Sequence, residues 1–385
     1  MPVHLIRLIT GQICLHACMT GLRLAAPLLA LRSGSSPAAV GFLLSLFALS
    51  QVFLALPAGR YANRHGLGRP MRLGVVTAMV GAALAAMWPV YPVLCVAALM
   101  AGAATGVVLI ALQRYVGRAV EGREDLRRAF SWLSIGPAAS NFLGPFVAGL
   151  LIDASGFRAA FAFCALMPLA CWALMRGTAE LPSVDEPDDR SALRGAADLL
   201  AQPDFRRLLL VNWCLSACWD VHTFVVPLLG HELHLSASVI GTILGSFAVA
   251  ATAIRLLLPI IAARQPEWRM LMISMLAGGL ILAVYPLQNH ALALGLCSVL
   301  LGFALGSVQP MVMSLLHQIT PEQHYGEALA LRLMTINASS VAMPLLFGAV
   351  GAVVGAAGVF WATALAVTSG SRLAWGLRRL EIGKD

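Results

Sequence analysis

The chain has 385 residues, of which 59% are hydrophobic and only 11% are charged. Soluble globular proteins carry about 25% charged residues, so this composition excludes a protein whose surface is mostly in contact with water. The formal net charge of +8 does not indicate nucleic-acid binding, because the basic residues lie in loops that alternate along the chain. We therefore predict a membrane protein that binds no nucleic acid and whose surface largely contacts the lipid bilayer.

Apolar segments long enough to cross a bilayer, which takes about 20 residues, follow one another along the whole chain. The first, from Leu5 to Leu31, is too long for a signal-peptide core and shows no clear cleavage site, so we interpret it as the first span. The predicted spans are residues 6–30, 38–58, 72–91, 93–115, 129–152, 157–176, 207–230, 237–262, 269–287, 291–317, 327–350 and 352–373. We therefore predict an all-α membrane protein with twelve transmembrane helices and both termini on one side.

The arginine residues predict the orientation of these spans. One set of loops receives most of them, as in the loop with Arg60, Arg64 and Arg69, whereas the opposite set contains only Arg32 and Arg158. Loops rich in Lys and Arg stay in the cytoplasm. We therefore predict cytoplasmic termini and a location in the plasma (inner) membrane.

The sequence contains an internal repeat. A shift of 200 residues places the first span on the seventh, so that Cys14-Leu15-His16-Ala17-Cys18 aligns with Cys214-Leu215-Ser216-Ala217-Cys218. The register holds at Gly41/Gly241, Phe47/Phe247, Gly102/Gly302 and Gly106/Gly306, and one residue out of step at Pro145/Pro344 and Gly149/Gly348. We predict two pseudo-symmetric six-helix bundles, 1–176 and 207–385, joined by a cytoplasmic linker over 177–206. Such repeats place a substrate site near the bilayer midplane, between the halves.

The loop after the second span carries the segment Gly59-Arg60-Tyr61-Ala62-Asn63-Arg64-His65-Gly66-Leu67-Gly68-Arg69. It resembles the loop 2–3 signature of the major facilitator superfamily (MFS). This resemblance implies a gating role for Gly59, Asn63, Arg64, Gly66 and Arg69. The family usually has Asp where this chain has Asn63, so any electrostatic latch should be weaker here.

The fifth span reads Gly136-Pro137-x6-Gly144-Pro145-x3-Gly149 and looks like the Gly/Pro-rich fifth helix of that family. Gly and Pro there permit close helix contact and bending. The fourth-helix Arg of many drug–proton antiporters is absent, since Ala97, Ala98 and Leu99 occupy that neighbourhood. The resemblance covers the whole chain and implies the MFS fold, transport by alternating access and a monomer, but it is weak for substrate.

Polar side chains form one stripe on the first span and an equivalent stripe on the seventh. At about 100° per residue, the first stripe consists of Gln12, His16, Met19, Thr20 and Arg23. The second consists of Asn212, Ser216, Trp219, Asp220 and Thr223. A lipid-facing stripe would not be polar, so both should face the protein interior or a wet cavity, which the resemblance implies is lined by helices one, four, seven and ten. The candidate substrate-binding residues are Gln12, His16, Arg23, Asn212, Ser216, Trp219, Thr223, Gln309 and Arg332.

Asp220 is the carboxylate that lies deep in a predicted span. Charged groups inside a bilayer are costly and are candidates for function. A carboxylate at this depth can bind and release a proton as access alternates, so our hypothesis is that Asp220 is the proton-coupling site. The alternative is a permanent ion pair with an arginine.

Three arginines also lie well within the predicted spans, away from their ends: Arg23, Arg255 and Arg332. An Arg can hold a carboxylate or phosphate with two parallel hydrogen bonds, so Arg23 and Arg332 make an anionic substrate plausible. The alternative is structural, with each Arg bound to backbone carbonyls or to Asp220. Arg255 can extend its charge toward the membrane surface, which favours a structural role. Gln309 can donate or accept hydrogen bonds in the cavity or between helices.

The paired cysteines of the first and seventh spans raise a soft-metal hypothesis, but they point away from the polar stripes, which favours packing. We expect no metal and no cofactor. An enzyme is disfavoured, because no span has HExxH spacing and no loop has a GxSxG signature. The favoured function is a proton-coupled carrier of a small organic solute. The alternatives are a drug-like efflux antiporter, a facilitative uniporter and a non-transporting sensor.

Overall fold

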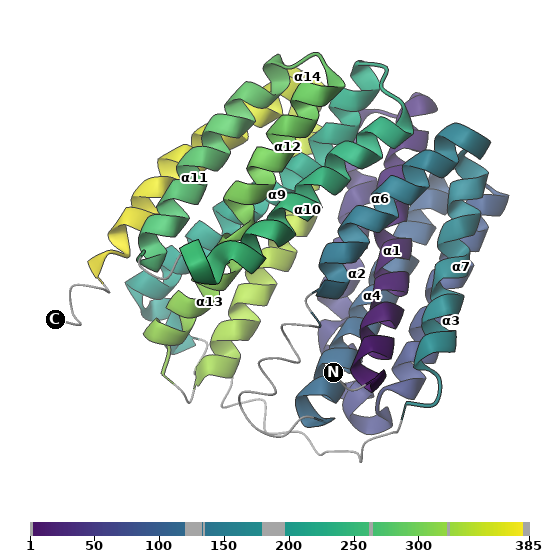
Figure 1. The fold of residues 1–385 in the computed structure, drawn as a ribbon, viewed down its shortest axis with the longest axis horizontal. Helices are drawn as coiled ribbons and strands as arrows, with labels where there is room; N and C mark the ends of the chain where they lie inside the picture. Colours follow the sequence, from purple (N-terminus) through teal and green to yellow (C-terminus); the bar gives the residue numbers. More distant parts are fainter. Residues whose placement is uncertain are drawn as a thin grey trace. The chain divides into compact units, whose positions relative to one another are not determined.

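The computed structural model describes residues 3–119, 133, 135–178, 197–261, 265–321 and 324–379, and this part of the chain is helical without any strand. Figure 1 shows the helices as long, roughly antiparallel rods within each half of the sequence. They are α1 (Val3–Arg32), α2 (Pro37–His65), α3 (Gly68–Met87), α4 (Tyr91–Ala119), α6 (Ile135–Ser155), α7 (Phe157–Met175), α9 (Pro203–Glu232), α10 (Ala237–Ile261), α11 (Glu267–Val284), η1 (Tyr285–Leu287), α12 (Ala291–Gly306), α13 (Val308–Ile319) and α14 (Tyr325–Gly376).

Eleven helical segments in the described ranges are long and apolar enough to cross a membrane. The predicted tenth span appears as α12 and α13, which adjoin at Ser307 and together form one apolar segment. The start of the predicted fifth span and most of the linker, residues 179–196, lie outside the described residues. The predicted all-helical membrane architecture is confirmed for the residues that the structure describes.

The predicted eleventh and twelfth spans together form α14, which has 52 residues. Its backbone leaves the helical conformation at Gly355 (φ 73°, ψ 176°), so α14 consists of two helices, residues 325–354 and 356–376. Gly156, between α6 and α7, has nearly the same conformation (φ 85°, ψ 175°) and is its repeat equivalent at the shift of 199 seen for Pro145/Pro344. The break lies four residues beyond the predicted boundary at 351, at a glycine that adopts a left-handed φ.

The chain folds into two compact units. Unit 1 contains residues 1–186 and 230–245, and unit 2 contains residues 187–229 and 246–385. The end of α9 and the first part of α10 therefore pack with the first half of the sequence. In unit 1, α1 packs against α6 and α7, α4 against α2 and α3, and α3 against α7; in unit 2, α11 packs against α12, α13 and α14.

Equivalent glycines make equivalent helix contacts in the two units. A Cβ atom at Gly102 of α4 would collide with the carbonyl oxygen of Phe47 in α2. A Cβ atom at Gly302 of α12 would likewise meet the carbonyl oxygen of Phe247 in α10. Small residues at such crossings let two backbones approach closely, which is how transmembrane helices gain packing energy.

The turns that precede α2 and α10 also repeat. Ser36 Oγ accepts the backbone N–H of Ala39 at 3.3 Å, and Ser236 Oγ accepts that of Val239 at 3.3 Å. The preceding left-handed position is Gly34 (φ 81°) in the first turn and His234 (φ 54°) in the second. Serine N-caps and a left-handed residue after a helix are common turn signals, and here they close the connection between neighbouring antiparallel helices.

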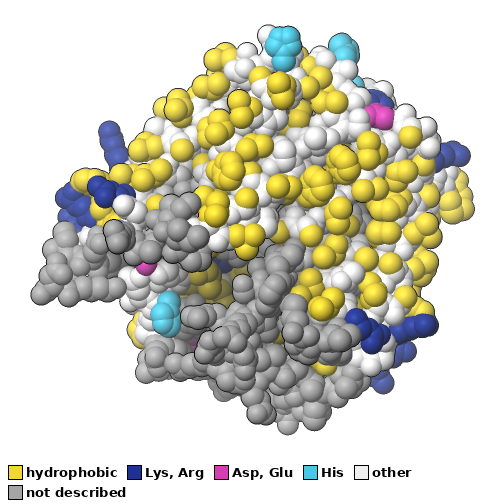
Figure 2. All heavy atoms as spheres, viewed as in Figure 1, with side chains coloured by type: hydrophobic (Ala, Val, Ile, Leu, Met, Phe, Trp, Pro, Cys, Tyr) yellow, Lys and Arg dark blue, Asp and Glu magenta, His cyan; other side chains and the backbone are white. Residues whose placement is uncertain are grey.

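Large apolar side chains cover the outer surface of the helices. Leu292, Val353 and Leu256 are exposed by 87%, 85% and 72%, and hydrophobic side chains dominate the face of the described helices in Figure 2. Patches of this extent are unfavourable in water. They indicate contact with lipid.

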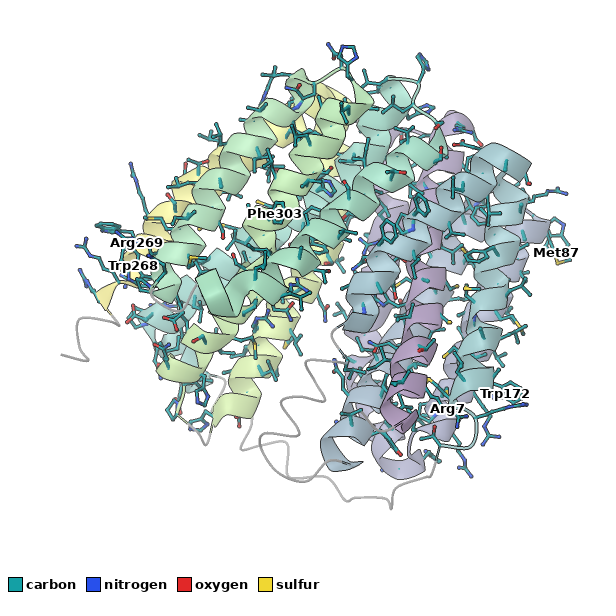
Figure 3. The ribbon with its side chains drawn as sticks, viewed as in Figure 1. Arg7, Met87, Trp172, Trp268, Arg269 and Phe303 are labelled. Carbon is teal, nitrogen blue, oxygen red and sulfur yellow. The ribbon has the colours of Figure 1, made fainter. Side chains whose placement is uncertain are left out.

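Aromatic and arginine side chains gather at particular helix ends. Arg7 Nε donates to the carbonyl oxygen of Leu174 at 3.1 Å, and Figure 3 shows Arg7 and Trp172 together at one end of α1 and α7. In unit 2, the rings of Trp268 and Trp375 meet edge to face at 5.4 Å. Aromatic rings and basic side chains are typical of the membrane–water interface.

Candidate functional site

Asp220 lies in the interior of unit 2 on α9, with 5% of its surface exposed. Ser339 Oγ donates to Asp220 Oδ2 at 2.8 Å, and Ser340 Oγ donates to Oδ1 at 3.2 Å. Both serines belong to α14, so both carboxylate oxygens are bound by one neighbouring helix. A serine hydroxyl can donate to an ionised carboxylate and accept from a protonated one. The arrangement is therefore compatible with binding and release of a proton.

Arg332 is also buried in unit 2, with 5% exposure. It lies seven residues before Ser339 on α14, which places both on the same face about 10 Å apart along the helix axis. Thr335, between them, donates its hydroxyl to the carbonyl oxygen of Leu331 in its own helix at 2.8 Å. The face of α14 that binds Asp220 thus also carries a buried cation.

The remaining predicted residues of α9 differ in their surroundings. Asn212 is 2% exposed, whereas Ser216 and Trp219 are half-buried. The indole of Trp219 packs edge-on against Phe247 of α10, with ring centroids 4.5 Å apart. Thr223 donates its hydroxyl to the carbonyl oxygen of Trp219 at 2.9 Å, so this hydroxyl is engaged within α9.

The polar stripe of α1 packs in part against α6 of unit 1. Thr20 Oγ1 donates to the carbonyl oxygen of Ser140 at 2.8 Å, and Ser140 Oγ donates back to the carbonyl oxygen of Ile13 at 3.1 Å. Gln12 is 4% exposed, and a Cβ atom at Gly136 would lie 2.7 Å from its Oε1. Thr20 and Gln12 therefore face the protein interior, where Thr20 bonds to α6 and Gln12 packs against it.

His16 and Arg23, the other predicted binding residues of α1, are half-buried. They belong to unit 1, whereas the predicted binding residues of α9 and α14 belong to unit 2. The structure brings Asp220 together with serines of α14, and Trp219 together with Phe247, within unit 2.

The Gly/Pro-rich α6 makes the close contacts that its sequence predicts. A Cβ atom at Gly144 would lie 2.9 Å from the carbonyl oxygen of Ala17 in α1. At Gly149 it would lie 2.9 Å from Ser238 Cα in α10. Two glycines thus hold α6 against two different helices.

The loop 2–3 motif forms the end of α2 and the start of α3. Gly59 lies against the guanidinium of Arg114, and Gly66 ends α2 with φ 66°. Arg64 and Arg69 are exposed, while the side chain of Asn63 lies outside the described part of the structure.

Two further residues singled out in the sequence lie near the junction of α12 and α13. Gln309 is exposed in the first turn of α13. Arg255 Nε donates to the carbonyl oxygen of Gly306 at 3.1 Å, where α12 ends. This contact ties the side chain of Arg255 in α10 to the junction of α12 and α13.

The cysteines lie in helix packing surfaces. In unit 2, Cys214 Sγ would lie 3.3 Å from a Cβ atom at Gly370 of α14, and Cys218 Sγ lies near Gly278 of α11. Over the described residues, no cluster of three or more His, Cys, Asp or Glu side chains could hold a metal ion.

Sequence reasoning missed three polar residues that the structure places in prominent positions. Ser340 lies on the predicted eleventh span, directly after Ser339, and Asp153 lies near the end of α6. His222 lies away from the polar stripe, yet it is 1% exposed and bonded to Ser298. The sequence did contain a signal for His222. The equivalent position of the first span is Leu22, so the seventh span has a polar residue where the first has an apolar one.

Comparison with known proteins identifies the family. The sequence profile described as Major Facilitator Superfamily matches residues 8–287 and 208–381. The Multidrug resistance protein MdtG of Serratia proteamaculans (strain 568) is 27% identical over 253 residues, which are 64% of this chain and 62% of that protein's length.

Solved transporter structures share the fold. A POT family transporter in complex with a thioalcohol conjugated peptide is 12% identical, with a TM-score of 0.79 over 97% of this chain and 96% of that one. The nucleoside transporter NupG is 15% identical, with a TM-score of 0.77 over 98% and 99%. The family predicted from the loop motif and α6 is confirmed. The chain belongs to the Major Facilitator Superfamily of membrane transporters.

Proposed function

We propose that this protein is a secondary active transporter that moves a small organic solute across the plasma (inner) membrane by alternating access, with proton coupling at Asp220. The protein acts as a monomer with twelve transmembrane helices and cytoplasmic termini. The two helices of α14, divided at Gly355, form the last two spans. The predicted halves, 1–176 and 207–385, act as the moving bundles.

The buried carboxylate of Asp220 carries this proposal. A charged group inside an apolar bundle is costly unless it has a function or full compensation. Asp220 receives one hydrogen bond on each oxygen from serine hydroxyls. Hydroxyl partners can adapt to either protonation state of the carboxyl group. This supports reversible proton binding at Asp220.

The solute binds to polar residues of α1, α9, α13 and α14. Arg23 and Arg332 favour a solute with a carboxylate or phosphate group, because a guanidinium can hold either with two parallel hydrogen bonds. Trp219 offers an aromatic surface beside Asp220. His16, Gln12, Asn212, Ser216, Thr223 and Gln309 supply further hydrogen-bonding groups.

A reconstituted assay tests transport and coupling separately. A first screen selects solutes that raise the melting temperature of the purified protein. Proteoliposomes that contain the protein are then assayed for counterflow of each selected solute and for its accumulation driven by a pH gradient. We expect Asp220→Asn to retain counterflow but to lose accumulation, because exchange needs no net proton movement. The matched control is Asp204→Asn, a carboxylate in the first turn of the same helix.

Two outcomes would contradict the proposal in different ways. Gradient-driven accumulation by Asp220→Asn at the wild-type rate would refute Asp220 as the coupling site. Binding of solutes without counterflow by the wild-type protein would instead favour the non-transporting sensor.

Drug-like efflux is a second candidate function, which the likeness to MdtG favours. The absence of an arginine near Ala97–Leu99 in the fourth span disfavours a drug–proton antiporter of the usual type. Inside-out vesicles with a fluorescent lipophilic cation added to the outside solution distinguish the two. Proton-driven dye uptake into these vesicles would support efflux, whereas an anionic solute that competes in counterflow would support our first proposal.

A further inference from the structure

A second buried polar cluster lies on the side of α9 that faces away from Asp220. His222 Nε2 and Ser298 Oγ are 2.8 Å apart, and Tyr285 Oη and Ser298 Oγ are 2.7 Å apart. The three residues come from α9, α12 and η1, and their exposures are 1%, 0% and 0%. We call His222, Ser298 and Tyr285 the α9 anchor.

Aromatic rings enclose this anchor. Phe247 of α10 stacks on the imidazole of His222 with centroids 4.4 Å apart, and Tyr285 stacks on Phe360 of α14 at 4.8 Å. Phe247 is also the ring against which Trp219 packs. The anchor therefore joins α9 to α10, α12 and α14, and it supports a residue of the candidate binding site through one intervening ring.

The first half of the sequence shows that the fold does not require a polar anchor. At a shift of 200 residues, the equivalents of His222, Tyr285 and Ser298 are Leu22, Ala85 and Ala98. These three apolar residues are buried as well, with exposures of 1%, 0% and 1%.

The aromatic support, by contrast, is shared by both halves. Phe247 corresponds to Phe47, and Phe360 corresponds to Phe161 at the shift of 199. Burying polar groups costs free energy that apolar packing does not. The half of the chain that carries Asp220 thus has buried polar side chains at positions where the other half packs apolar ones.

The anchor can control how α9 presents Asp220. Asp220 and His222 are two residues apart and so about 200° apart around the helix. Asp220 bonds to α14 on one side, while His222 bonds to Ser298 of α12 on the other, and Ser298 in turn bonds to Tyr285 of η1. Hydrogen bonds are directional, unlike apolar packing, so the two contacts together define the rotation of α9 about its axis.

We propose that His222 is a positioning residue for the proton site: through Ser298 and Tyr285 it holds α9 in the rotation that places Asp220 against Ser339 and Ser340. This rests on the proposed function of Asp220. Two donor orders satisfy both contacts: Tyr285 to Ser298 to His222, and His222 to Ser298 to Tyr285. Loss of the anchor loosens the serine bonds and alters proton binding at Asp220.

The test measures proton binding at Asp220 without a transported solute. Dicyclohexylcarbodiimide modifies protonated carboxyl groups in apolar surroundings, and mass spectrometry of the peptide that contains Asp220 gives the fraction modified at each pH. The variant is His222→Leu/Ser298→Ala/Tyr285→Phe, which imitates the apolar first half. Apolar replacement of all partners leaves no buried group unsatisfied, so the variant should fold.

The pH of half-modification is the pH at which half of the Asp220 side chains are modified. We expect it to move by about half a unit or more in the triple variant, since hydrogen bonds to a charged group contribute substantially to its protonation equilibrium. His222→Gln, whose amide can still bind Ser298, should keep the wild-type profile. Tyr285→Phe removes one hydroxyl, retains the stacking on Phe360, and should give a smaller shift in the pH of half-modification. If the triple variant does not fold, this single variant is measured in its place.

Wild-type pH profiles in both the triple variant and Tyr285→Phe would overturn the positioning role, even where the melting temperature falls. A wild-type protein whose Asp220 modification shows no dependence on pH would overturn the proton site itself. The two failures are therefore distinguishable.

Discussion

Asp153 and Ser238 are 85 residues apart in the sequence, yet a carboxylate oxygen of Asp153 accepts the backbone N–H of Ser238 at 2.7 Å. The other oxygen accepts the backbone N–H of Ala237 at 3.0 Å. These are the first two residues of α10, so the end of α6 caps the N-terminus of α10, whose first part belongs to unit 1. Directly beneath, Gly149 lies against both residues and Gly241 lies against the carbonyl oxygen of Pro145.

We expect Asp153→Ala to destabilise the protein by about 1–2 kcal/mol, because it removes an N-cap and a negative charge near a helix N-terminus. Asp153→Asn should cost less, since its amide oxygen still accepts one N–H. Thermal unfolding of the purified protein measures both. Arg158→Gln, an exposed charge change in the next helix, is the control, and equal melting temperatures for it and Asp153→Ala would show that the cap contributes nothing.

The two serines that bind Asp220 should not be equivalent. Ser339 is fully buried and its bond is 2.8 Å long, whereas Ser340 is half-buried and its bond is 3.2 Å long. A hydrogen bond to a charged group contributes about 1.5–3 kcal/mol. We expect Ser339→Ala to move the pH of half-modification of Asp220 by about one unit and Ser340→Ala to move it less, measured by carbodiimide labelling. The reverse order would contradict the contacts described here.

The turn before α10 contains a strained residue that glycine should relieve. His234 has φ 54°, a conformation that its repeat equivalent Gly34 adopts at φ 81°. We expect His234→Gly to stabilise the protein by about 0.5–1 kcal/mol, and Gly34→Ala to destabilise it by a similar amount, because a Cβ atom disfavours this region. Melting temperatures of the two variants, compared with wild type, should move in opposite directions. Movement in the same direction would refute the interpretation.

Glycines at helix crossings should differ sharply from glycines that face outward. A Cβ atom at Gly102 would collide with the backbone of Phe47, whereas one at Gly295 would meet no atom within 4 Å. We expect Gly102→Ala to cost about 1–3 kcal/mol through overpacking, while Gly295→Ala should be neutral or slightly stabilising, because alanine favours the helix. The melting temperatures of both variants, purified in detergent, can be compared with that of the wild-type protein. Comparable losses would argue against close packing of α2 and α4.

The repeat predicted much of the local structure, because it records the same backbone constraint twice. Gly156 and Gly355 share one conformation, and Gly102 and Gly302 make the same contact. Hydropathy predicted the spans for a similar reason, since contact with lipid depends on the side chains of each segment alone. The predicted boundary between the eleventh and twelfth spans, residue 351, misses the observed break at Gly355. Apolar residues lie on both sides of the break, so hydropathy does not mark its position.

The partners of the polar residues could not be predicted in the same way. Helical periodicity placed Asn212, Ser216 and Asp220 on one face of α9, but it contains no information about which helix packs against that face. Thr20 and Asp220 are repeat equivalents, yet Thr20 bonds to α6 of unit 1 and Asp220 bonds to α14 of unit 2. His222 lies off the polar stripe, yet it bonds to Ser298 in the interior.

The sequence by itself determined that this is a helical membrane protein built from a duplicated unit, with one carboxylate deep in the seventh span, because apolar length, charge asymmetry and repeat register are properties of the chain alone. The tertiary structure decided that Ser339 and Ser340 bind Asp220, that Asp153 caps α10 and that His222 is anchored to Ser298. Those pairings join helices far apart in the sequence, and the rotation and crossing of each helix depend on the packing of its neighbours.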